Sequence, residues 1–193
     1  DIDLKTNWIK SGKKSFLYYE KVDSTLNIAL DVHHQEQSVG KIVITDNQVS
    51  GKGTYNKSWY SEPCKDLTFS IILGSSYNFH QQLIDDTCTA IVNVLQKQKI
   101  NAHHKKPNDI YVMNKKIAGI LLSNVHSRKE VIYQALSLGI NINSDLNIRS
   151  FDSKAKADHT SFVKELGKEV NREKILVDII QSIDLAIQKQ INL

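Results

Sequence analysis

The residues best suited to chemistry lie where a polar segment leads into two apolar runs. Pro107, Asn108 and Asp109 place an amide and a carboxylate directly after a proline, and Lys116 follows the carboxylate by seven residues. Proline fixes its own φ angle, and Asn and Asp side chains bond to nearby backbone, so this is a rigid entry. The pattern predicts an amide and a carboxylate at the mouth of a sheet, with Lys116 close by on the return strand. A stable hairpin with solvated lysines is the structural alternative for the same residues.

The two apolar runs predict a β-hairpin that would position these groups. They are Ile110–Met113 and Ile117–Val125, and the polar turn expected between them is Asn114-Lys115-Lys116. The second run is apolar on both faces, which is typical of a buried strand. Strict alternation puts Ile117 and Leu121 on one face and Ala118, Ile120 and Leu122 on the other.

A glycine-rich segment offers a second place for an anion. Gly51 and Gly53 flank Lys52, and Gln48 and Trp59 bound the segment. Glycines let the backbone come close to a ligand and turn its N–H groups toward an anion, while the lysine supplies charge. Tight hairpins use the same residues, and the segment is not a P-loop, because Gly-x-x-x-x-Gly-Lys-Ser/Thr does not occur.

The remaining apolar patterns predict further strands and helices around these two segments. The strands are expected over residues 15–20, 41–46, 67–73 and 130–143. The helices are expected to carry the apolar residues of 26–30, 83–95 and 175–187. Asp23, Ser24 and Thr25 offer capping side chains to the first helix, and Asn171 offers one to the last.

Composition limits the classes of protein that fit. The chain has 193 residues, of which 40% are hydrophobic and 24% charged, as expected for one compact domain. The net charge of +4, from 25 basic and 21 acidic residues, suits nucleotide phosphates or an acidic protein partner and is too weak to argue for nucleic acid. No apolar run approaches the ~18 residues of a membrane span, and no signal peptide is expected. Cys64 and Cys88 make neither a disulfide framework nor a metal set, so a reducing cytoplasm is the default location.

These segments together resemble the biotin protein ligase family. The run Lys105–Asp109, followed by Lys116-Ile-Ala-Gly119, is similar in content and spacing to the signature of that family, which has Trp where this chain has Lys106. Further matches follow in order within residues 15–190. They are Ser24 and Thr25 of a Ser-Thr-Asn motif, Gln48, Gly51, Gly53 and Trp59 of a Gln-x-x-Gly-Arg-Gly-Arg-x-x-x-x-Trp loop, Gly139 and Asn141 of Gly-x-Gly-x-Asn, and His159–Phe162 of Ala-Thr-Ser-Leu.

The chain also departs from the family pattern. Besides Lys106, Leu26 replaces the Asn of the first motif, and Asn27 comes one residue late. Lys52 and Thr54 replace the two loop arginines, so the loop carries less fixed charge and has no bidentate guanidinium. Ser137 replaces the first glycine of Gly-x-Gly-x-Asn.

The resemblance implies an α+β fold, with a mixed, largely antiparallel central sheet and helices packed on one face. It implies a single catalytic domain over residues 1–193, without the N-terminal winged helix and the C-terminal SH3-like domain that some members carry.

The resemblance also implies a two-step reaction. The carboxylate of biotin attacks the α-phosphorus of ATP to give biotinyl-5′-AMP and pyrophosphate. A lysine of a biotin carboxyl carrier protein domain, part of a biotin-dependent carboxylase, then takes the biotinyl group. The residues implied in catalysis are Lys116, Asp109 and Lys52. Those implied in binding biotin are Ser24, Thr25, Gln48, Gly51, Lys52, Lys116 and Gly119. Those implied in binding ATP and the adenylate are Gly53, Thr54, Trp59, Lys105, Asn108 and Asn141, with Asn141 also placed near Mg²⁺.

Two alternatives stay open at this stage. One is a lipoate or octanoate transferase on the same scaffold, although the Gly-Gly-Gly-rich loop of lipoate ligases does not occur here. The other is a ligand-binding relative without turnover, which the departures at Leu26, Thr54, Lys106 and Ser137 would support. DNA binding is not expected, because no helix-turn-helix precedes Ser15. A homodimer is compatible with the sequence.

Overall fold

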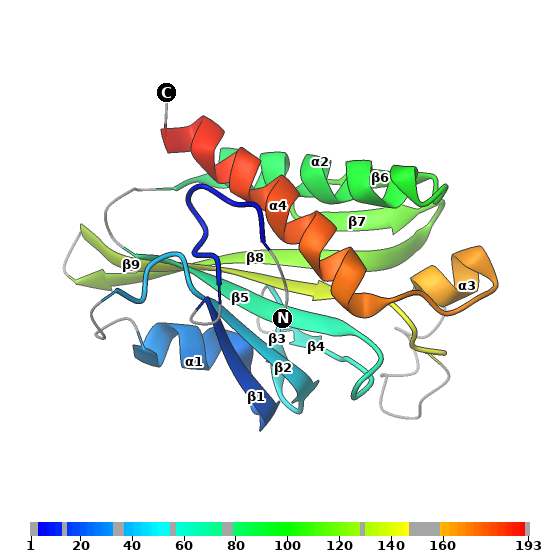
Figure 1. Cartoon of the computed structure of the whole chain (residues 1–193), viewed down its shortest axis with the longest axis horizontal. Coiled ribbons are helices and arrows are strands. Elements are labelled where there is room, and N and C mark those ends of the chain that lie inside the picture. Colours follow the sequence, from blue (N-terminus) through cyan, green and yellow to red (C-terminus); the bar gives the residue numbers. More distant parts are fainter. Residues whose placement is uncertain are drawn as a thin grey trace.

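The computed structural model describes residues 4–12, 15–32, 37–54, 57–74, 79–127, 130–146 and 159–191. A seven-stranded sheet forms the middle of the molecule, in the order β1-β2-β5-β9-β8-β7-β6 (Figure 1). Its strands are β1 Phe16–Val22, β2 Ile42–Gln48, β5 Leu67–Gly74, β6 Ala102–Lys105, β7 Asp109–Val112, β8 Lys115–Ser127 and β9 Glu130–Ile140. Two short strands, β3 Gly51–Lys52 and β4 Ser58–Trp59, pair separately. The helices are α1 Thr25–Asp31, α2 Gln81–Lys97, α3 Phe162–Leu166 and α4 Arg172–Ile191.

The sheet is mixed and largely antiparallel, which confirms the predicted fold class. Only β1 and β2 pair in parallel, and every other neighbouring pair among the described strands is antiparallel. Parallel neighbours need a connection that crosses the sheet, and α1 makes this connection between β1 and β2. Strands β6 to β9 follow one another as hairpins, and β8 and β9 pair over most of their length.

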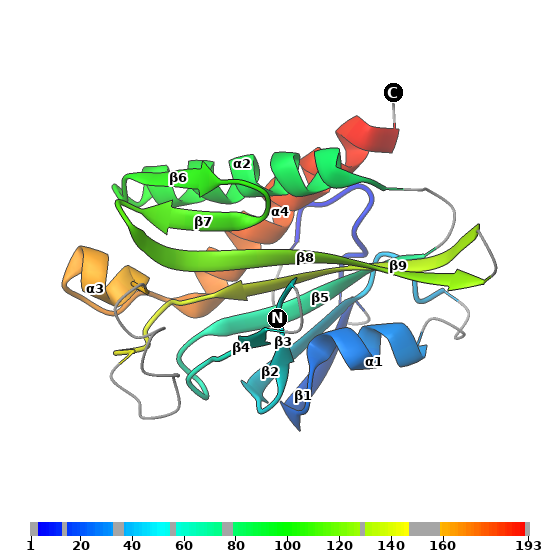
Figure 2. The same ribbon diagram turned by 180° about the vertical axis from the view of Figure 1, so that it is seen from behind.

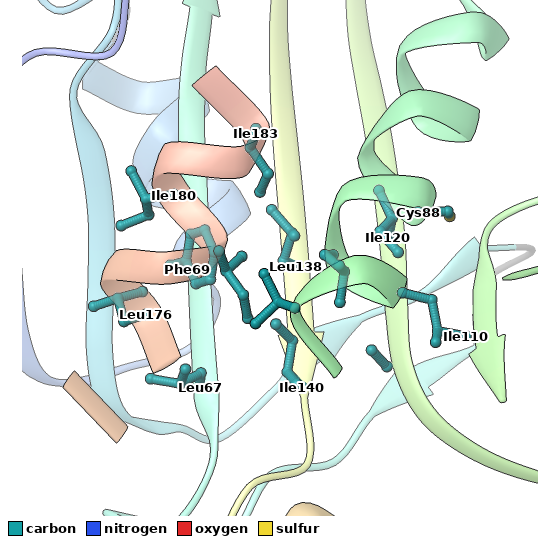
Figure 3. Packing of buried hydrophobic residues seen from close by; sticks show 14 of the residues in the cluster. Leu67, Phe69, Cys88, Ile110, Ile120, Leu138, Ile140, Leu176, Ile180 and Ile183 are labelled. Atoms are coloured by element: carbon teal, nitrogen blue, oxygen red, sulfur yellow. The ribbon is translucent and has the colours of Figure 1, made fainter. Parts of the chain in front are cut away.

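The main core lies between the sheet and two long helices. The inward residues of β5 and β9, such as Phe69 and Leu138, are fully or almost fully buried and face Ile180 and Ile183 of α4 (Figure 3). Cys88 of α2 packs in the same cluster. Burial of each such Ile, Leu or Phe side chain contributes roughly 1.5–3 kcal/mol to the free energy of unfolding, so this layer holds the sheet rigid beneath the polar groups on its other face.

Helix α1 lies on the opposite face of the sheet, so the prediction of helices on one face was incomplete (Figure 2). Its residues Leu26 and Ala29 pack on Val43 and Ile72, whose side chains point away from α2 and α4. Tyr133 of β9 donates a hydrogen bond from its Oη to the Ala29 carbonyl at 2.9 Å. Helix α1 covers this face because β1 and β2 are parallel. The crossover that joins parallel strands is right-handed, and its handedness determines which face of the sheet its helix covers.

The turn of the β7–β8 hairpin differs from the prediction. It lies at Met113 and Asn114, and Met113 takes a φ of +52°, so Lys115 and Lys116 are strand residues. Ile110 pairs with Ala118, but Tyr111 pairs with Lys116, which leaves Ile117 as an extra residue in β8. This is a β-bulge, and it changes which face the following side chains occupy.

Because of this bulge, the face of the strand predicted for Ile117 was wrong. This side chain is fully buried in the main core together with Ile120, not on the face of Leu121. Lys116 instead comes to the same face as Gly119, three residues along the strand.

Among the described residues, no helix combines the length and the apolar character that crossing a bilayer requires.

Candidate functional site

A small pocket lies on the α1 face of the sheet, where the β2–β4 segment folds over β8 and β9. It brings together most of the residues that the sequence predicted. Those lining it are Ser24, Thr25, Gln48, Lys52, Gly53, Thr54, Trp59, Asn108, Asp109, Lys116 and Gly119. The further lining residues are Leu26, Ile120, Leu121, Ser137, Leu138 and Gly139. Three predicted site residues, Gly51, Lys105 and Asn141, are not part of the lining.

Lys116 and Asp109 form an ion pair at the pocket wall. Lys116 Nζ lies 2.6 Å from Asp109 Oδ1, and the two side chains are only 21% and 25% exposed. The β-bulge makes the pair possible, because a regular ladder would put Lys116 opposite Val112, which faces the core. Partial exclusion of water strengthens the field of the ammonium, so this is a suitable place for a carboxylate or phosphate.

Trp59 covers a floor made by two paired glycines. Gly119 of β8 lies opposite Gly139 of β9, and a Cβ atom built on Gly139 would collide with the indole of Trp59. A Cβ atom on Gly119 would come within 3.1 Å of both Trp59 and Lys116 Nζ. Lys116 Nζ lies 5.3 Å from the centre of the Trp59 ring, within reach of a cation–π interaction. Gly139 is therefore needed for the close approach of the indole, whereas a side chain at Gly119 would require the indole or the ammonium to shift by a few tenths of an ångström.

The pocket is contracted around this indole. Its free volume is about 40 Å³, whereas small-molecule sites usually measure roughly 300–1,000 Å³. Within the described part of the chain, the indole N–H of Trp59 is buried and has no hydrogen-bond partner. A buried donor without a partner is costly, so this N–H is available to a ligand that enters beside it.

The end of the pocket near α1 is polar. Gln48 Oε1 accepts hydrogen bonds from the backbone N–H of Thr25 at 2.9 Å and from Thr25 Oγ1 at 3.2 Å. Ser24 is the N-cap residue of α1 but makes no side-chain capping bond, so the carboxamide of Gln48 replaces the cap expected from Ser24. Ser70 of β5 bonds to Thr25 Oγ1 at 2.9 Å and to Ser137 Oγ at 2.8 Å. Sequence patterns did not single out Ser70, because these hydroxyls meet only when β5 and β9 pair.

The glycine-rich segment forms the β3–β4 hairpin and is tied to α1. Lys52 Nζ donates to Asn27 Oδ1 at 2.7 Å. Asn27 lies one residue after the position where the resembled family has its Asn. It thus binds Lys52, the residue that was predicted to hold phosphate. Gly51 lies outside the lining, and its role is close packing, because a Cβ atom there would collide with the Trp59 backbone and the Gln48 side chain.

Three predicted residues have structural partners of their own. Asn108 lines the pocket, and its Nδ2 donates to the Ile120 carbonyl at 2.6 Å. Asn141 is 1% exposed and donates from Nδ2 to the Thr160 carbonyl at 2.9 Å. Lys105 is exposed, and its Nζ lies 4.1 Å from the centre of the Tyr111 ring. The roles predicted for Asn141 and Lys105 therefore stay predictions, and both lie away from the pocket wall.

Lys106, which stands where the resembled family has Trp, points into solvent beside α2. Its side chain is 78% exposed and lies 3.3 Å from Asp85 of α2. A hydrogen bond from Gln81 and the Lys106 ammonium together lower the pKa of the Asp85 carboxyl. Gln81 Nε2 also donates to the Pro107 carbonyl at 2.9 Å, so α2 braces the turn before Asn108.

Comparisons with known proteins agree on one family. The sequence model of the Biotin/lipoate A/B protein ligase family matches residues 18–143. The bifunctional ligase/repressor BirA of Bacillus subtilis is 27% identical over 177 residues, which cover 90% of this chain and 53% of BirA. This chain thus spans about half the length of that relative.

Solved structures share the fold. The biotin protein ligase of Aquifex aeolicus in complex with biotin and ATP has a TM-score of 0.75 and 25% identity, over 91% of this chain and 71% of the other. A T. acidophilum protein described as a lipoate protein ligase, with bound lipoic acid, has a TM-score of 0.61 and 14% identity, over 91% of this chain and 86% of the other. The second likeness shows the fold alone.

Proposed function

The chain belongs to the biotin/lipoate A/B protein ligase family, and we propose on this basis that it is a biotin protein ligase. It activates biotin with ATP to biotinyl-5′-AMP and transfers the biotinyl group to a lysine of a biotin carboxyl carrier protein domain. The observation that carries the proposal is the Lys116–Asp109 pair beside Gly119, in one pocket with Gln48 and Thr25. That pocket combines a place for an anion with a polar end for a ring that carries hydrogen-bonding groups.

Lys116 would act in the first step. A carboxylate oxygen of biotin attacks the α-phosphorus of ATP, the bond from phosphorus to the bridging oxygen breaks, and pyrophosphate leaves. Two anionic groups must approach each other, so the step depends on positioning and charge neutralisation. The ammonium of Lys116, held 2.6 Å from Asp109, can face both anions. Lys52 and the backbone N–H group of Thr54 would hold phosphate oxygens, because both residues also line the pocket, whereas the Gly53 N–H donates to the Lys57 carbonyl at 2.7 Å.

Asp109 would act in the second step. The ε-amine of the carrier lysine attacks the carbonyl carbon of the mixed anhydride, an amide bond forms, AMP leaves, and the amine loses a proton. The Asp109 carboxylate lies on the same wall as Lys116 and can orient the amine and accept a hydrogen bond from it. Orientation is its larger contribution, because carboxylates are weak bases.

Mg²⁺ would arrive with the nucleotide. The described residues contain no group of three or more His, Cys, Asp or Glu side chains arranged to hold a metal. Mg²⁺ keeps several waters and is usually bound through substrate phosphates, with few protein ligands, so such a pocket is compatible with it. Asn108 is the predicted amide that lines the pocket, whereas Asn141 is buried against Thr160. We place the reaction in the cytoplasm, where Cys64 and Cys88 would stay as free thiols.

The test is a substrate panel with the purified chain. Pyrophosphate release would be measured with ATP, Mg²⁺ and, in parallel, biotin, lipoate or octanoate. Transfer would be measured by mass spectrometry of a biotin carboxyl carrier protein domain, with the Lys→Arg variant of its acceptor residue as control. We expect pyrophosphate release with biotin. The carrier with its native acceptor lysine should gain the mass of one biotinyl group, and the Lys→Arg carrier should gain none. Release with lipoate or octanoate but not with biotin would establish another acyl specificity, and biotin binding without release would indicate a relative without turnover.

A further inference from the structure

Three hydroxyl groups and one amide form a hydrogen-bonded row below the pocket. The row runs from Gln48 of β2 through Thr25 of α1 and Ser70 of β5 to Ser137 of β9, with separations of 3.2, 2.9 and 2.8 Å. Ser70 is fully buried and lies outside the lining, and the Thr25 hydroxyl is bonded on both sides, so the two ends of the row are the groups with hydrogen-bonding capacity left for a ligand. Gln48 and Ser137 both line the pocket.

The backbone of Thr25 sets the direction of this row. Its N–H can only donate, so the Gln48 atom that faces it at 2.9 Å must be the carboxamide oxygen. The same oxygen faces Thr25 Oγ1, which must therefore donate its proton to Gln48. The backbone N–H of Thr25, which cannot accept a hydrogen bond, thus fixes the orientation of the Gln48 amide.

The direction then passes from one hydroxyl to the next. A serine or threonine hydroxyl carries one proton. Thr25 uses its proton on Gln48, so it must accept from Ser70, and Ser70 in turn must accept from Ser137. Every proton in the row points toward Gln48, and each bond polarises the next.

The two ends of the row consequently offer opposite groups to a ligand. Ser137 has already donated its proton into the protein, so the pocket meets only its lone pairs, which accept. Gln48 has committed its oxygen to Thr25, so only its NH₂ group is left to donate. A matching ligand carries an N–H group toward Ser137.

We infer that Ser137 determines acyl specificity by accepting a hydrogen bond from a ring N–H of the substrate. The inference deepens the proposed function, on which it rests, and concerns a position that the resembled family fills with glycine. The cyclic urea of biotin has two N–H donors and one carbonyl acceptor. A dithiolane ring or a saturated chain has no N–H, so it would bury the Ser137 lone pairs without a partner. Sites built around such a bond strongly reject analogues that lack it.

The experiment compares three proteins with two ligands. Dissociation constants for biotin and for lipoate would be measured by calorimetry, without ATP, on the wild type, Ser137→Ala and Ser123→Ala. Ser123 is a matched control because it is on the neighbouring strand β8 and lies outside the pocket lining. We expect Ser137→Ala to weaken biotin binding about tenfold, equivalent to about 1.4 kcal/mol, and not to weaken lipoate binding, because lipoate no longer buries an unpaired hydroxyl. Ser123→Ala should change neither.

Each outcome bears on the inference. A preference for biotin over lipoate that falls about tenfold in Ser137→Ala supports it. An unchanged preference, or an equal loss of affinity for both ligands, overturns the inference and does not affect the proposed function. A wild-type protein that binds lipoate better than biotin, or binds neither, overturns both the inference and the proposed function. Melting temperatures of the three proteins establish that each is folded.

Discussion

Trp59 lies directly on the backbone of Gly139, because that position has no side chain to keep the indole away. The contact joins the β3–β4 hairpin to the central sheet and sets the height of the indole above Lys116. The first prediction tests this contact. Gly139→Ala should displace Trp59 and lower adenylate formation at least tenfold, while the sheet stays folded because the indole can swing aside.

A double-mutant cycle separates this effect from strain within β9. In a Trp59→Ala background the added methyl group has nothing to displace, so Gly139→Ala should then have little further effect. Pyrophosphate release and melting temperature would be measured for all four proteins. Equal losses with and without the indole would mean that the backbone of β9, and not Trp59, requires the glycine.

Trp59 should move when substrate binds, since the free volume of about 40 Å³ is too small for a bicyclic acid. The chain has two tryptophans, so a Trp8→Phe variant reports on Trp59 alone. We expect the emission of this variant to shift when biotin and ATP are added, because the indole N–H of Trp59, buried without a partner, would then have new surroundings. Addition of an unrelated acid such as benzoate is the control. An emission spectrum that stays constant at saturating biotin and ATP would show that the pocket opens elsewhere.

Lys116→Ala should lower adenylate formation by about a hundredfold or more, since one preorganised electrostatic group contributes roughly 3 kcal/mol to the transition state. The matched control is Lys115→Ala, which removes an exposed lysine one residue earlier that lies outside the pocket lining. Lys116 is a strand residue paired with a half-buried Asp109, so its removal should also cost about 1 kcal/mol in the free energy of unfolding. Near-normal pyrophosphate release by Lys116→Ala would remove this residue from the mechanism.

Thr54→Arg should lengthen the lifetime of bound biotinyl-adenylate about tenfold. Thr54 lines the pocket at a position where the family pattern has arginine, and a guanidinium there could hold the phosphate by two charge-assisted hydrogen bonds. Differences in affinity are mostly differences in the dissociation rate. The measurement is release of preformed biotinyl-adenylate during a chase with unlabelled biotin, with Thr54→Gln as an uncharged control. Off-rates that agree within about twofold would show that Lys116 and backbone amides hold the phosphate alone.

The two cysteines should differ sharply in reactivity. Cys64 is exposed, whereas burial raises the pKa of the Cys88 thiol from 9.0 to about 12. One thiol should therefore react with iodoacetamide at pH 8 in the native protein, and two after denaturation. The pKa of Cys88 is higher in the folded protein than in the unfolded chain, so its ionisation has no effect on the free energy of unfolding below pH 9. Above pH 9 the free energy of unfolding should fall, as the unfolded chain ionises and the folded one does not.

The pH dependence needs a variant that lacks this thiol, since tyrosines and lysines titrate in the same range. Cys88→Ala should lose part of the decline in the free energy of unfolding between pH 9 and pH 11, although its small cavity lowers stability at every pH. Urea unfolding of both proteins across that range is the measurement. Parallel pH profiles would mean that Cys88 ionises as easily in the folded protein as in the unfolded one.

The sequence predicted the elements of this fold well and their exact ends less well. The apolar spacing of residues 83–95 predicted α2, and Asn171 does cap α4, since its Oδ1 accepts from the backbone N–H of Lys174 at 3.0 Å. The turn of the β7–β8 hairpin was misplaced because Met113, an apolar residue, occupies it with a positive φ. Propensity alone does not reveal such a turn, since the neighbouring register decides it.

Site residues close in sequence could be predicted, and contacts made across strands could not. Pro107, Asn108 and Asp109 form one local motif, and its spacing to Lys116 indicated a site. The hydroxyl row from Ser137 to Thr25 depends on the pairing of β9 with β5 and on the position of α1 above it. No local pattern encodes that pairing. The predicted place of Asn141 near Mg²⁺ came from resemblance, and the structure turns its amide toward Thr160.

The extra residue at Ile117 has a mechanical consequence for the far end of the chain. Where the β7–β8 ladder is interrupted, two carbonyl groups of β8 bond to other parts of the chain. The Lys116 carbonyl accepts from the backbone N–H of Thr160, and the Ile117 carbonyl accepts from that of Asn141, both at 2.9 Å. The segment that leads into α3 and α4 is therefore fastened to the very peptide groups that carry the pocket lysine. A shift of that segment, caused by a binding partner or a truncation, would be transmitted to the Lys116 ammonium through the backbone, with no side chain acting as intermediary.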